Sequence, residues 1–218
     1  MIDFARARAQ MVEGQLRAGG VHTLSILASM RAVPRERFVT ESRRPLAYAD
    51  MIHWYDGPAP ARFMAPALIL ARLLGLAEIT PDDTVLDLGA ATGYSTAVIA
   101  RLAAAVTALE PDAGLAAAAS ANLAALGLDN ARVIAGGIEQ LDGAAFDVIV
   151  VQGSLDSVPD ALFSALNEGG RLVALVNAGP TGVAQVFVKA AGKVTARSDF
   201  NALLPPLFSG VADDEFIF

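Results

Sequence analysis

The feature that most constrains the fold is a regular alternation of short apolar runs with helical segments between residues 84 and 176. Short apolar strands that alternate with helices imply right-handed crossovers and a parallel sheet covered on both faces. The expected strands are Thr84–Leu88, Ala105–Leu109, Arg132–Ala135, Phe146–Val151 and Arg171–Val176. The expected helices between them are Tyr94–Ala103, Asp112–Leu126 and Pro159–Leu166.

The pattern changes on either side of this core. Two further strands, Val183–Ala190 and Lys193–Phe200, are joined around Gly192 and add a hairpin with an antiparallel strand at the sheet edge. Upstream, helical spacing predicts helices over Phe4–Leu16, Leu24–Val33 and Ala67–Leu76. The sequence thus predicts one α/β, Rossmann-like domain over residues 1–218: N-terminal helices and a loop over the site (1–79), a mostly parallel seven-stranded sheet with helices on both faces (80–200), and a tail (201–218).

Composition excludes several kinds of site and partner. The chain has no cysteine, which rules out disulfides, thiolate metal ligands and a cysteine nucleophile. Its net charge of −7 disfavours nucleic acid and anionic membranes as partners. The two histidines, His22 and His53, stand alone, so no metal site is expected. We expect no membrane helix and no signal peptide, and a cytoplasmic location.

A turn after the first core strand carries the clearest functional signal. Asp87 ends the strand, and Gly89 and Gly93 follow before a helix begins. Glycines let the backbone approach a ligand closely, and the helix presents free N–H groups to it. The spacing differs from the Gly-x-Gly-x-x-Gly of dinucleotide binders, and an acid before the glycines would repel a pyrophosphate. With Glu110 placed to accept ribose hydroxyls after the second strand, the pattern favours an adenosyl ligand over an ordinary tight turn.

The chain resembles the protein-L-isoaspartate O-methyltransferases over nearly its whole length. The N-terminal segments that carry the resemblance are Met11–Val21, Met30–Val39 and Leu46–Asp50, and these are the specific ones. The core segments, shared by many methyltransferases, are Val85–Ala97, Phe146–Val151, Val158–Leu162 and Gly169–Val173. The resemblance implies the class I methyltransferase fold and S-adenosylmethionine as the cofactor.

The resemblance also assigns expected roles to residues. Asp87, Gly89 and Gly93 would line the methionine side of the cofactor, and Glu110 would hold its ribose. Ala91, at the middle glycine position of the loop, and Gly136, after the third core strand, complete the expected cofactor-binding set. The implied reaction is methyl transfer to the free α-carboxylate of an isoaspartyl residue in a protein or peptide. The ester then collapses towards a succinimide, which allows repair.

The acceptor side departs from the family pattern. Relatives have Gln-Thr-Ile-Ser-Gln-Pro before the third helix, whereas this chain reads Ala61-Arg-Phe-Met-Ala-Pro66. Arg62 stands at the threonine position and Met64 at the serine position, which is the family's active-site residue, so no catalytic residue can be named. Arg62 either offers a charge to a substrate carboxylate or pairs with Asp50 or Asp56, and we favour the pair. Met64 is expected to pack.

Other departures surround the cofactor loop. Trp54 and Tyr55 either wall the pocket or anchor the long loop of residues 45–66. Ala91 in place of glycine asks for a negative φ. The acid that relatives carry near the adenine is absent from Ala135–Ile138, and Glu139 lies two residues away from that position. Gln152-Gly-Ser154 replaces the usual small and hydroxyl residues after the fourth strand.

Three functions remain open from the sequence. The chain methylates isoaspartyl proteins with a rebuilt acceptor site, methylates another carboxylate or small-molecule acceptor, or is a non-catalytic binding or scaffolding homologue. The tail, Pro205–Gly210 and Asp213–Phe218, either packs back on the domain or contacts a partner.

Overall fold

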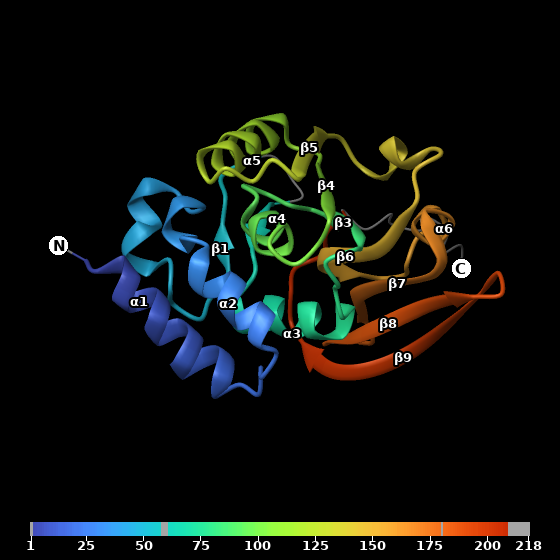
Figure 1. The fold of residues 1–218 in the computed structure, drawn as a ribbon, viewed down its shortest axis with the longest axis horizontal. Coiled ribbons are helices and arrows are strands. Elements are labelled where there is room, and N and C mark those ends of the chain that lie inside the picture. Colours follow the sequence, from blue (N-terminus) through green and yellow to red (C-terminus); the bar gives the residue numbers. More distant parts are fainter. Residues whose placement is uncertain (1, 58–60, 180, 209–218) are drawn as a thin grey trace, which may run out of the picture.

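The computed structural model describes residues 2–57, 61–179 and 181–208 and has a seven-stranded sheet at its centre (Figure 1). The strands are β3 (Thr84–Leu88), β4 (Ala105–Glu110), β5 (Ala131–Ala135), β6 (Phe146–Leu155), β7 (Leu166–Asn177), β8 (Gly182–Ala190) and β9 (Lys193–Ala202). Their order is β5-β4-β3-β6-β7-β8-β9. The first five pair in parallel, and β8 and β9 pair antiparallel. The mostly parallel α/β sheet predicted from the sequence is confirmed.

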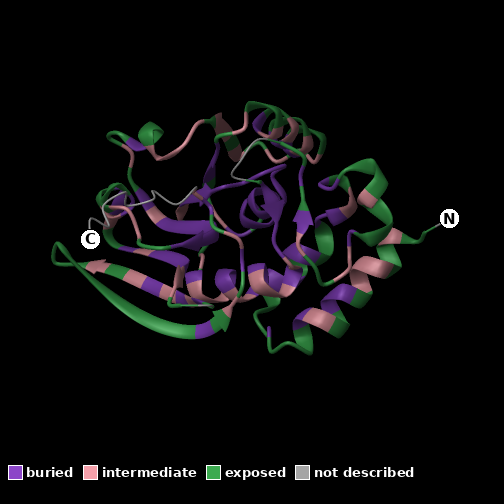
Figure 2. Ribbon diagram, turned by 180° about the vertical axis from the view of Figure 1, so that it is seen from behind, coloured by how far each residue is buried: buried purple, intermediate pink, exposed green. Residues whose placement is uncertain are grey.

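Apolar residues along each core strand alternate between the two faces. In β3, Val85 belongs to one core cluster and Leu86 to the other. The first face is covered by five helices, α1 (Phe4–Met11), α2 (Leu24–Ala32), α3 (Ala67–Ala77), α4 (Tyr94–Ile99) and α5 (Ala113–Ala125). The second face has less cover: the short helix α6 (Asp160–Ser164), the 3-10 turn η4 (Ile138–Leu141) and Leu207. Figure 2 shows the buried sheet and the more exposed β8–β9 hairpin. Leu207, near the C-terminal end of the described residues, is therefore part of the core.

Element ends differ from the predicted ones in the middle of the chain. The helix expected to reach Ala103 ends at Ile99, because Leu102 already donates to the Ile99 carbonyl in a tighter turn. Strands β6 and β7 are longer than expected, and Leu166 pairs with Phe146, so α6 ends at Ser164. The start of α5 agrees with the predicted one, because the Asp112 side chain caps the helix by accepting a hydrogen bond from the Leu115 N–H.

The N-terminal segment wraps against the first face. Helix α1 continues as the π-helical turn η1 (Val12–Arg17), so the predicted helix over residues 4–16 is present. Short 3-10 turns follow at η2 (Arg35–Arg37) and η3 (Glu41–Leu46). Buried Arg35 joins this segment to the start of α3, since Nε donates to the Ala47 carbonyl at 2.9 Å and Nη2 to the Ala65 carbonyl at 2.6 Å.

The long loop predicted over residues 45–66 contains more structure than expected. Strands β1 (His53–Trp54) and β2 (Phe63–Met64) form a two-stranded antiparallel sheet within it. Residues 58–60 and the acidic and apolar end of the tail, Asp213–Phe218, lie outside the described residues. Within the described ranges, no helix has the length and hydropathy needed to cross a membrane.

Candidate functional site

Asp87 is fully buried at the carboxyl end of β3. Its Oδ2 accepts from Ser95 Oγ at 2.7 Å and Thr96 Oγ1 at 2.6 Å, both in the first turn of α4. Its Oδ1 accepts from Gln152 Nε2 at 2.7 Å, across from β6. Burial raises the pKa of the Asp87 carboxyl, and the three hydrogen bonds oppose that rise. The strand end and the helix start thus hold this carboxylate rigidly.

Glu110 lies at the carboxyl end of β4, beside Asp87, and is also fully buried. Its Oε2 accepts the Ala91 N–H at 2.7 Å, and its Oε1 accepts the Asp112 N–H at 3.0 Å. Parallel pairing of β3 with β4 sets Leu88 opposite Leu109. Because the carboxyl ends of neighbouring parallel strands meet at one edge of the sheet, the two acids predicted from the sequence come together around the Gly89–Gly93 turn.

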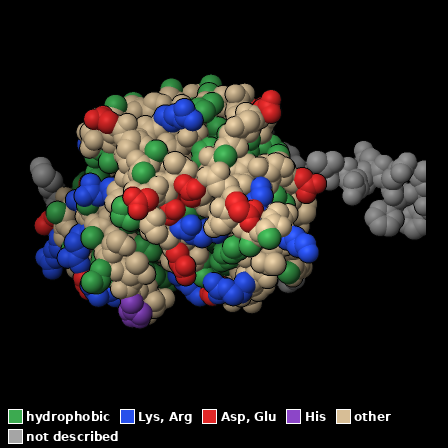
Figure 3. Space-filling view, turned by 45° about the vertical axis from the view of Figure 1, so that its right-hand side comes forward, with side chains coloured by type: hydrophobic (Ala, Val, Ile, Leu, Met, Phe, Trp, Pro, Cys, Tyr) green, Lys and Arg blue, Asp and Glu red, His purple; other side chains and the backbone are tan. Residues whose placement is uncertain are grey.

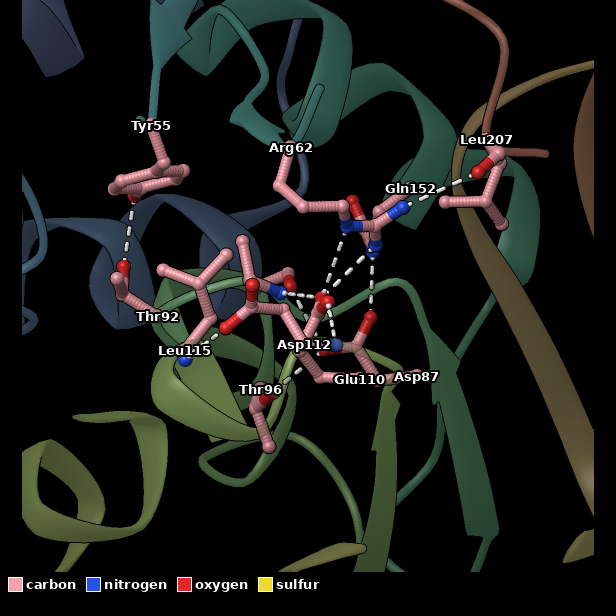
Figure 4. A network of polar contacts seen from close by, with 12 residues as sticks. Tyr55, Arg62, Asp87, Thr92, Thr96, Glu110, Asp112, Leu115, Gln152 and Leu207 are labelled. Atoms are coloured by element: carbon pink, nitrogen blue, oxygen red, sulfur yellow. Dashed lines mark hydrogen bonds and ion pairs between the residues drawn. The ribbon is translucent and has the colours of Figure 1, made fainter. Parts of the chain in front are cut away.

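Arg62 fills the space above these acids (Figure 4). Its Nη2 lies 2.9 Å from Glu110 Oε2, and the two side chains are 8% and 0% exposed. The guanidinium also donates from Nη1 to the Leu207 carbonyl at 3.2 Å. The pairing of β1 with β2 brings Arg62 here, since the Tyr55 N–H donates to the Arg62 carbonyl at 2.9 Å. The expected partner was Asp50 or Asp56; that expectation is wrong, because the guanidinium turns inward to Glu110.

The C-terminal segment, residues 204–208, closes the same space from the other side. The Leu207 N–H donates to the Ser154 carbonyl and the Ser154 N–H donates to the Pro205 carbonyl, each at 2.9 Å. A Cβ on Gly89 would lie 2.4 Å from Leu207 Cδ1 and 2.8 Å from Arg62 Nη2. The φ of 87° favours glycine at 89, and a Cβ there would also push on the ends of the Leu207 and Arg62 side chains.

The turn itself is more strained than the sequence suggested. Ala91 was expected to take a negative φ, but its φ is +49°. In this left-handed conformation the Ala91 N–H points at Glu110, and that contact explains why the conformation is kept. Gly93, with a φ of 90°, precedes the first residue of α4. Gly136 lies at the end of β5, and its N–H donates to the Glu110 carbonyl at 3.0 Å.

Little room remains among these groups. The cavity beside the turn has a volume of about 10 Å³, enough for roughly one water molecule. Its lining includes Tyr55, Met64, Thr92 and Gln152. Sites for small molecules and cofactors usually measure roughly 300–1,000 Å³. Among the described residues, the side chains beside this turn thus leave little space for a ligand.

The comparisons with known proteins decide the family. The family model for protein-L-isoaspartate(D-aspartate) O-methyltransferases matches residues 6–212. The chain belongs to this family. Its members are S-adenosylmethionine-dependent methyltransferases.

Relatives support the same assignment. A protein-L-isoaspartate O-methyltransferase of Koribacter versatilis is 41% identical over 194 residues, which cover 88% of this chain and 86% of the relative. One of Methylorubrum extorquens is 40% identical over 184 residues, covering 83% and 77%.

Solved structures show the same fold. A protein-L-isoaspartate O-methyltransferase superposes with a TM-score of 0.81 at 24% identity, over 93% of this chain and 66% of that one. A putative protein-L-isoaspartate O-methyltransferase from Plasmodium falciparum, in complex with S-adenosyl-L-homocysteine, superposes with a TM-score of 0.74 at 22% identity, over 92% and 98%. The Rossmann-like class I fold is thereby confirmed.

Among the positions singled out in the sequence, Met64 and Tyr55 are buried, whereas Trp54 and Glu139 are exposed. Met64, at the serine position, is 6% exposed and belongs to the larger core cluster, as expected. Tyr55 both lines the small cavity and anchors its loop, because its hydroxyl donates to the Phe38 carbonyl at 2.6 Å and contacts Thr92 Oγ1 at 2.7 Å. Trp54 is 40% exposed and packs on Phe63. Glu139 binds the Gly137 N–H of its own turn at 2.6 Å.

The chemical groups of the site suit S-adenosylmethionine, because two carboxylates and a glycine turn surround the expected position of the ligand. The space does not fit, because Arg62 pairs with the carboxylate expected to hold the ribose and Leu207 lies against Gly89. Leu207 and the Glu110 partner were missed by sequence reasoning. Gln152, noted in the sequence only as a departure from the family pattern, proves to be a hydrogen-bond partner of Asp87.

Proposed function

We propose that this chain transfers the methyl group of S-adenosylmethionine to a carboxylate oxygen, with the free α-carboxylate of an isoaspartyl residue in a protein or peptide as the acceptor. The observation that carries the proposal is the pair of buried acids, Asp87 and Glu110, on either side of the Gly89–Gly93 turn. The family to which the chain belongs supports the reaction type, and the relatives' names support the acceptor.

Each residue of the site has a proposed role. Asp87 would hold the amino group of the methionine moiety, and Glu110 would accept the ribose hydroxyls. Gly89 and Gly93 let the backbone approach, while Ala91 and Gly136 shape the rim. When bound, S-adenosylmethionine supplies an electrophilic methyl group on a sulfonium. Because a carboxylate is already a nucleophile, the protein has only to position the acceptor and exclude water.

The charge of the chain bears on the acceptor. A net charge of −7 supports a protein or peptide acceptor over nucleic acid. Figure 3 shows Lys and Arg side chains interspersed with Asp and Glu on the face that it presents. The cytoplasmic location expected from the sequence stays a prediction.

A second candidate function is a non-catalytic binding or scaffolding homologue. The observation that favours it is the Arg62–Glu110 ion pair, which satisfies the ribose-binding carboxylate without any ligand. The family's threonine and serine positions carry Arg62 and Met64 in this chain. The loss of these two hydroxyls favours a non-catalytic homologue, and it equally favours a methyltransferase with a different acceptor.

Methyl transfer from labelled S-adenosylmethionine separates these functions. We expect label on a peptide that contains an isoaspartyl residue and none on its normal aspartyl twin. Label on other carboxylates alone would show that the acceptor is not an isoaspartyl residue. No label on any acceptor, from a folded protein that binds the cofactor, would contradict the proposal. In the double variant Arg62→Thr with Met64→Ser, faster transfer would show that the family's acceptor pocket survives around these positions.

A further inference from the structure

Four hydrogen bonds reach the carboxylate of Glu110, three of them on Oε2 and one on Oε1. Two backbone N–H groups and the Arg62 guanidinium bind its two oxygens, at 2.7, 3.0 and 2.9 Å. A ribose would need to place its hydroxyls on those oxygens. Since the guanidinium is a charged donor and a hydroxyl is a neutral one, the ribose must compete with a stronger internal ligand.

Leu207 blocks the neighbouring part of the site. Its side chain is 3% exposed and lies against Gly89 and Gly153, where added Cβ atoms would meet it at 2.4 and 3.0 Å. It is joined to Arg62, whose Nη1 donates to its carbonyl at 3.2 Å. The two residues come from points 145 positions apart in the chain and fill one space together.

The positive charge of Arg62 also stabilises the site when no ligand is bound. Asp87 and Glu110 are both fully buried, and the negative charge of Glu110 acts on Asp87. Like charges in a low-dielectric interior are costly unless a cation compensates them. Arg62 supplies that compensation when no positively charged ligand is present.

We propose that Arg62 and Leu207 form a latch that occupies the cofactor site of the free protein, so that these two residues set the apparent affinity for S-adenosylmethionine. This inference rests on the proposed function, since it assumes that the site between Asp87 and Glu110 takes the cofactor. The cofactor binds only the open form, in which the guanidinium has left Glu110 and residues 204–208 have moved off Gly89. The observed dissociation constant is then the intrinsic one divided by the fraction of open molecules.

The test is the affinity for S-adenosylhomocysteine, which cannot transfer a methyl group, measured by calorimetry on the full chain. Two variants open the latch by different means: Arg62→Gln removes the charge and Leu207→Ala removes the plug. We expect the dissociation constant to fall by at least about tenfold in each. Leu203→Ala is the matched control, because this leucine directly precedes the segment but is 65% exposed, and the affinity of this variant should equal that of the wild type.

The outcomes separate the latch from the proposed function. Equal affinity in wild type, Arg62→Gln and Leu207→Ala would overturn the latch and leave the cofactor site standing. No binding by any of them at millimolar ligand would overturn both. If Arg62→Gln fails to fold, Leu207→Ala decides alone, because it changes no charge.

Hydrogen exchange gives a second readout that needs no variant. The Leu207 and Ser154 N–H groups are bonded between the C-terminal segment and β6. Bound S-adenosylhomocysteine should make the Leu207 amide exchange faster, whereas ligands ordinarily slow exchange around their site. Slower or unchanged exchange of the Leu207 amide at saturating ligand would contradict the latch.

Discussion

The guanidinium of Arg62 lies 2.9 Å from the carboxylate of Glu110, and the two side chains are 8% and 0% exposed. The pair joins the β1–β2 loop to the end of β4, where a methyltransferase of this family is expected to hold its cofactor. A buried ion pair costs desolvation that its attraction only partly repays, so such a pair is weak evidence for stability in itself. Its position at the site is what gives it a functional meaning.

Removing one charge of this pair should destabilise the protein strongly. In Glu110→Gln the Arg62 guanidinium stays buried without its counter-charge, and we expect a loss of about 3–5 kcal/mol in the free energy of unfolding. The double variant Glu110→Gln with Arg62→Met should recover most of that loss. Urea unfolding of the four proteins in this cycle measures the coupling. A Glu110→Gln protein within about 1 kcal/mol of wild type would show that the pair is not formed in solution.

At Ala91, in the strained turn, a substitution should stabilise the protein. Its φ of +49° costs a residue with a Cβ roughly 1–2 kcal/mol, while glycine carries no such penalty but has a more flexible unfolded chain. Ala91→Gly should therefore raise the free energy of unfolding by about 0.5–1 kcal/mol. Ala90→Gly, at a neighbouring buried residue without a positive φ, is the control and should lower it. A stability loss in both variants would contradict the left-handed turn.

Sequence reasoning succeeded where the physical signal was local or periodic. The strands around Thr84–Leu88 and Ala105–Leu109 were predicted because buried parallel strands are continuous apolar runs. The cap at Asp112 followed from the same local logic. The acids Asp87 and Glu110 were placed at the carboxyl ends of two strands because Asp87 ends the first and Glu110 follows the second. The division of the chain into helices, core and tail stays a prediction.

The partner of Arg62 could not be read in this way. The prediction chose Asp50 or Asp56 because they are near in sequence, but Glu110 lies 48 positions away and meets Arg62 only through the fold. Leu207 carries no pattern at all, since one apolar residue near the end of a chain has many possible places to pack. The positive φ of Ala91 was not predicted, because alanine in place of glycine suggested a negative φ at this position. The hydrogen bond from the Ala91 N–H to Glu110 keeps the left-handed conformation.

Acid should destabilise the protein through His53. The side chain is 1% exposed, and burial together with the positive charges of Arg35 and Arg43 lowers its pKa from 6.5 to about 4. Below pH 6.5 the unfolded chain takes up a proton that the folded protein refuses, so the free energy of unfolding falls between pH 6.5 and 4. This contribution amounts to at most about 3 kcal/mol.

Unfolding measured from pH 7 to pH 4 checks this prediction. His53→Leu should lose less stability over that range than the wild type, because leucine cannot take up a proton. The substitution breaks no hydrogen bond of a ring nitrogen among the described residues. His22→Leu, at an exposed histidine, is the control and should follow the wild type. Parallel pH curves for wild type and His53→Leu would refute the assignment.

The hydroxyl of Thr96 should matter for the buried acid. Thr96 Oγ1 donates to Asp87 Oδ2 at 2.6 Å, and both residues are fully buried. Thr96→Val keeps the shape and removes the donor, which should cost about 1.5–3 kcal/mol of unfolding free energy, as for a hydrogen bond to a charged group. Chemical denaturation measures the loss. Ser120→Ala removes a hydrogen bond to the Ala116 carbonyl within α5 and should cost less unfolding free energy. Equal losses in the two variants would contradict a hydrogen bond from Thr96 to a buried charged carboxylate.

The most direct test observes the Arg62 guanidinium during a titration with S-adenosylhomocysteine. In protein labelled with ¹⁵N-arginine, the Nε–H signal that is missing from Arg62→Gln is that of Arg62. The account predicts that this signal shifts and loses its protection from solvent exchange in step with ligand occupancy, because the ribose takes Glu110 and frees the guanidinium. Saturation of the site with the Arg62 signal unchanged would contradict it.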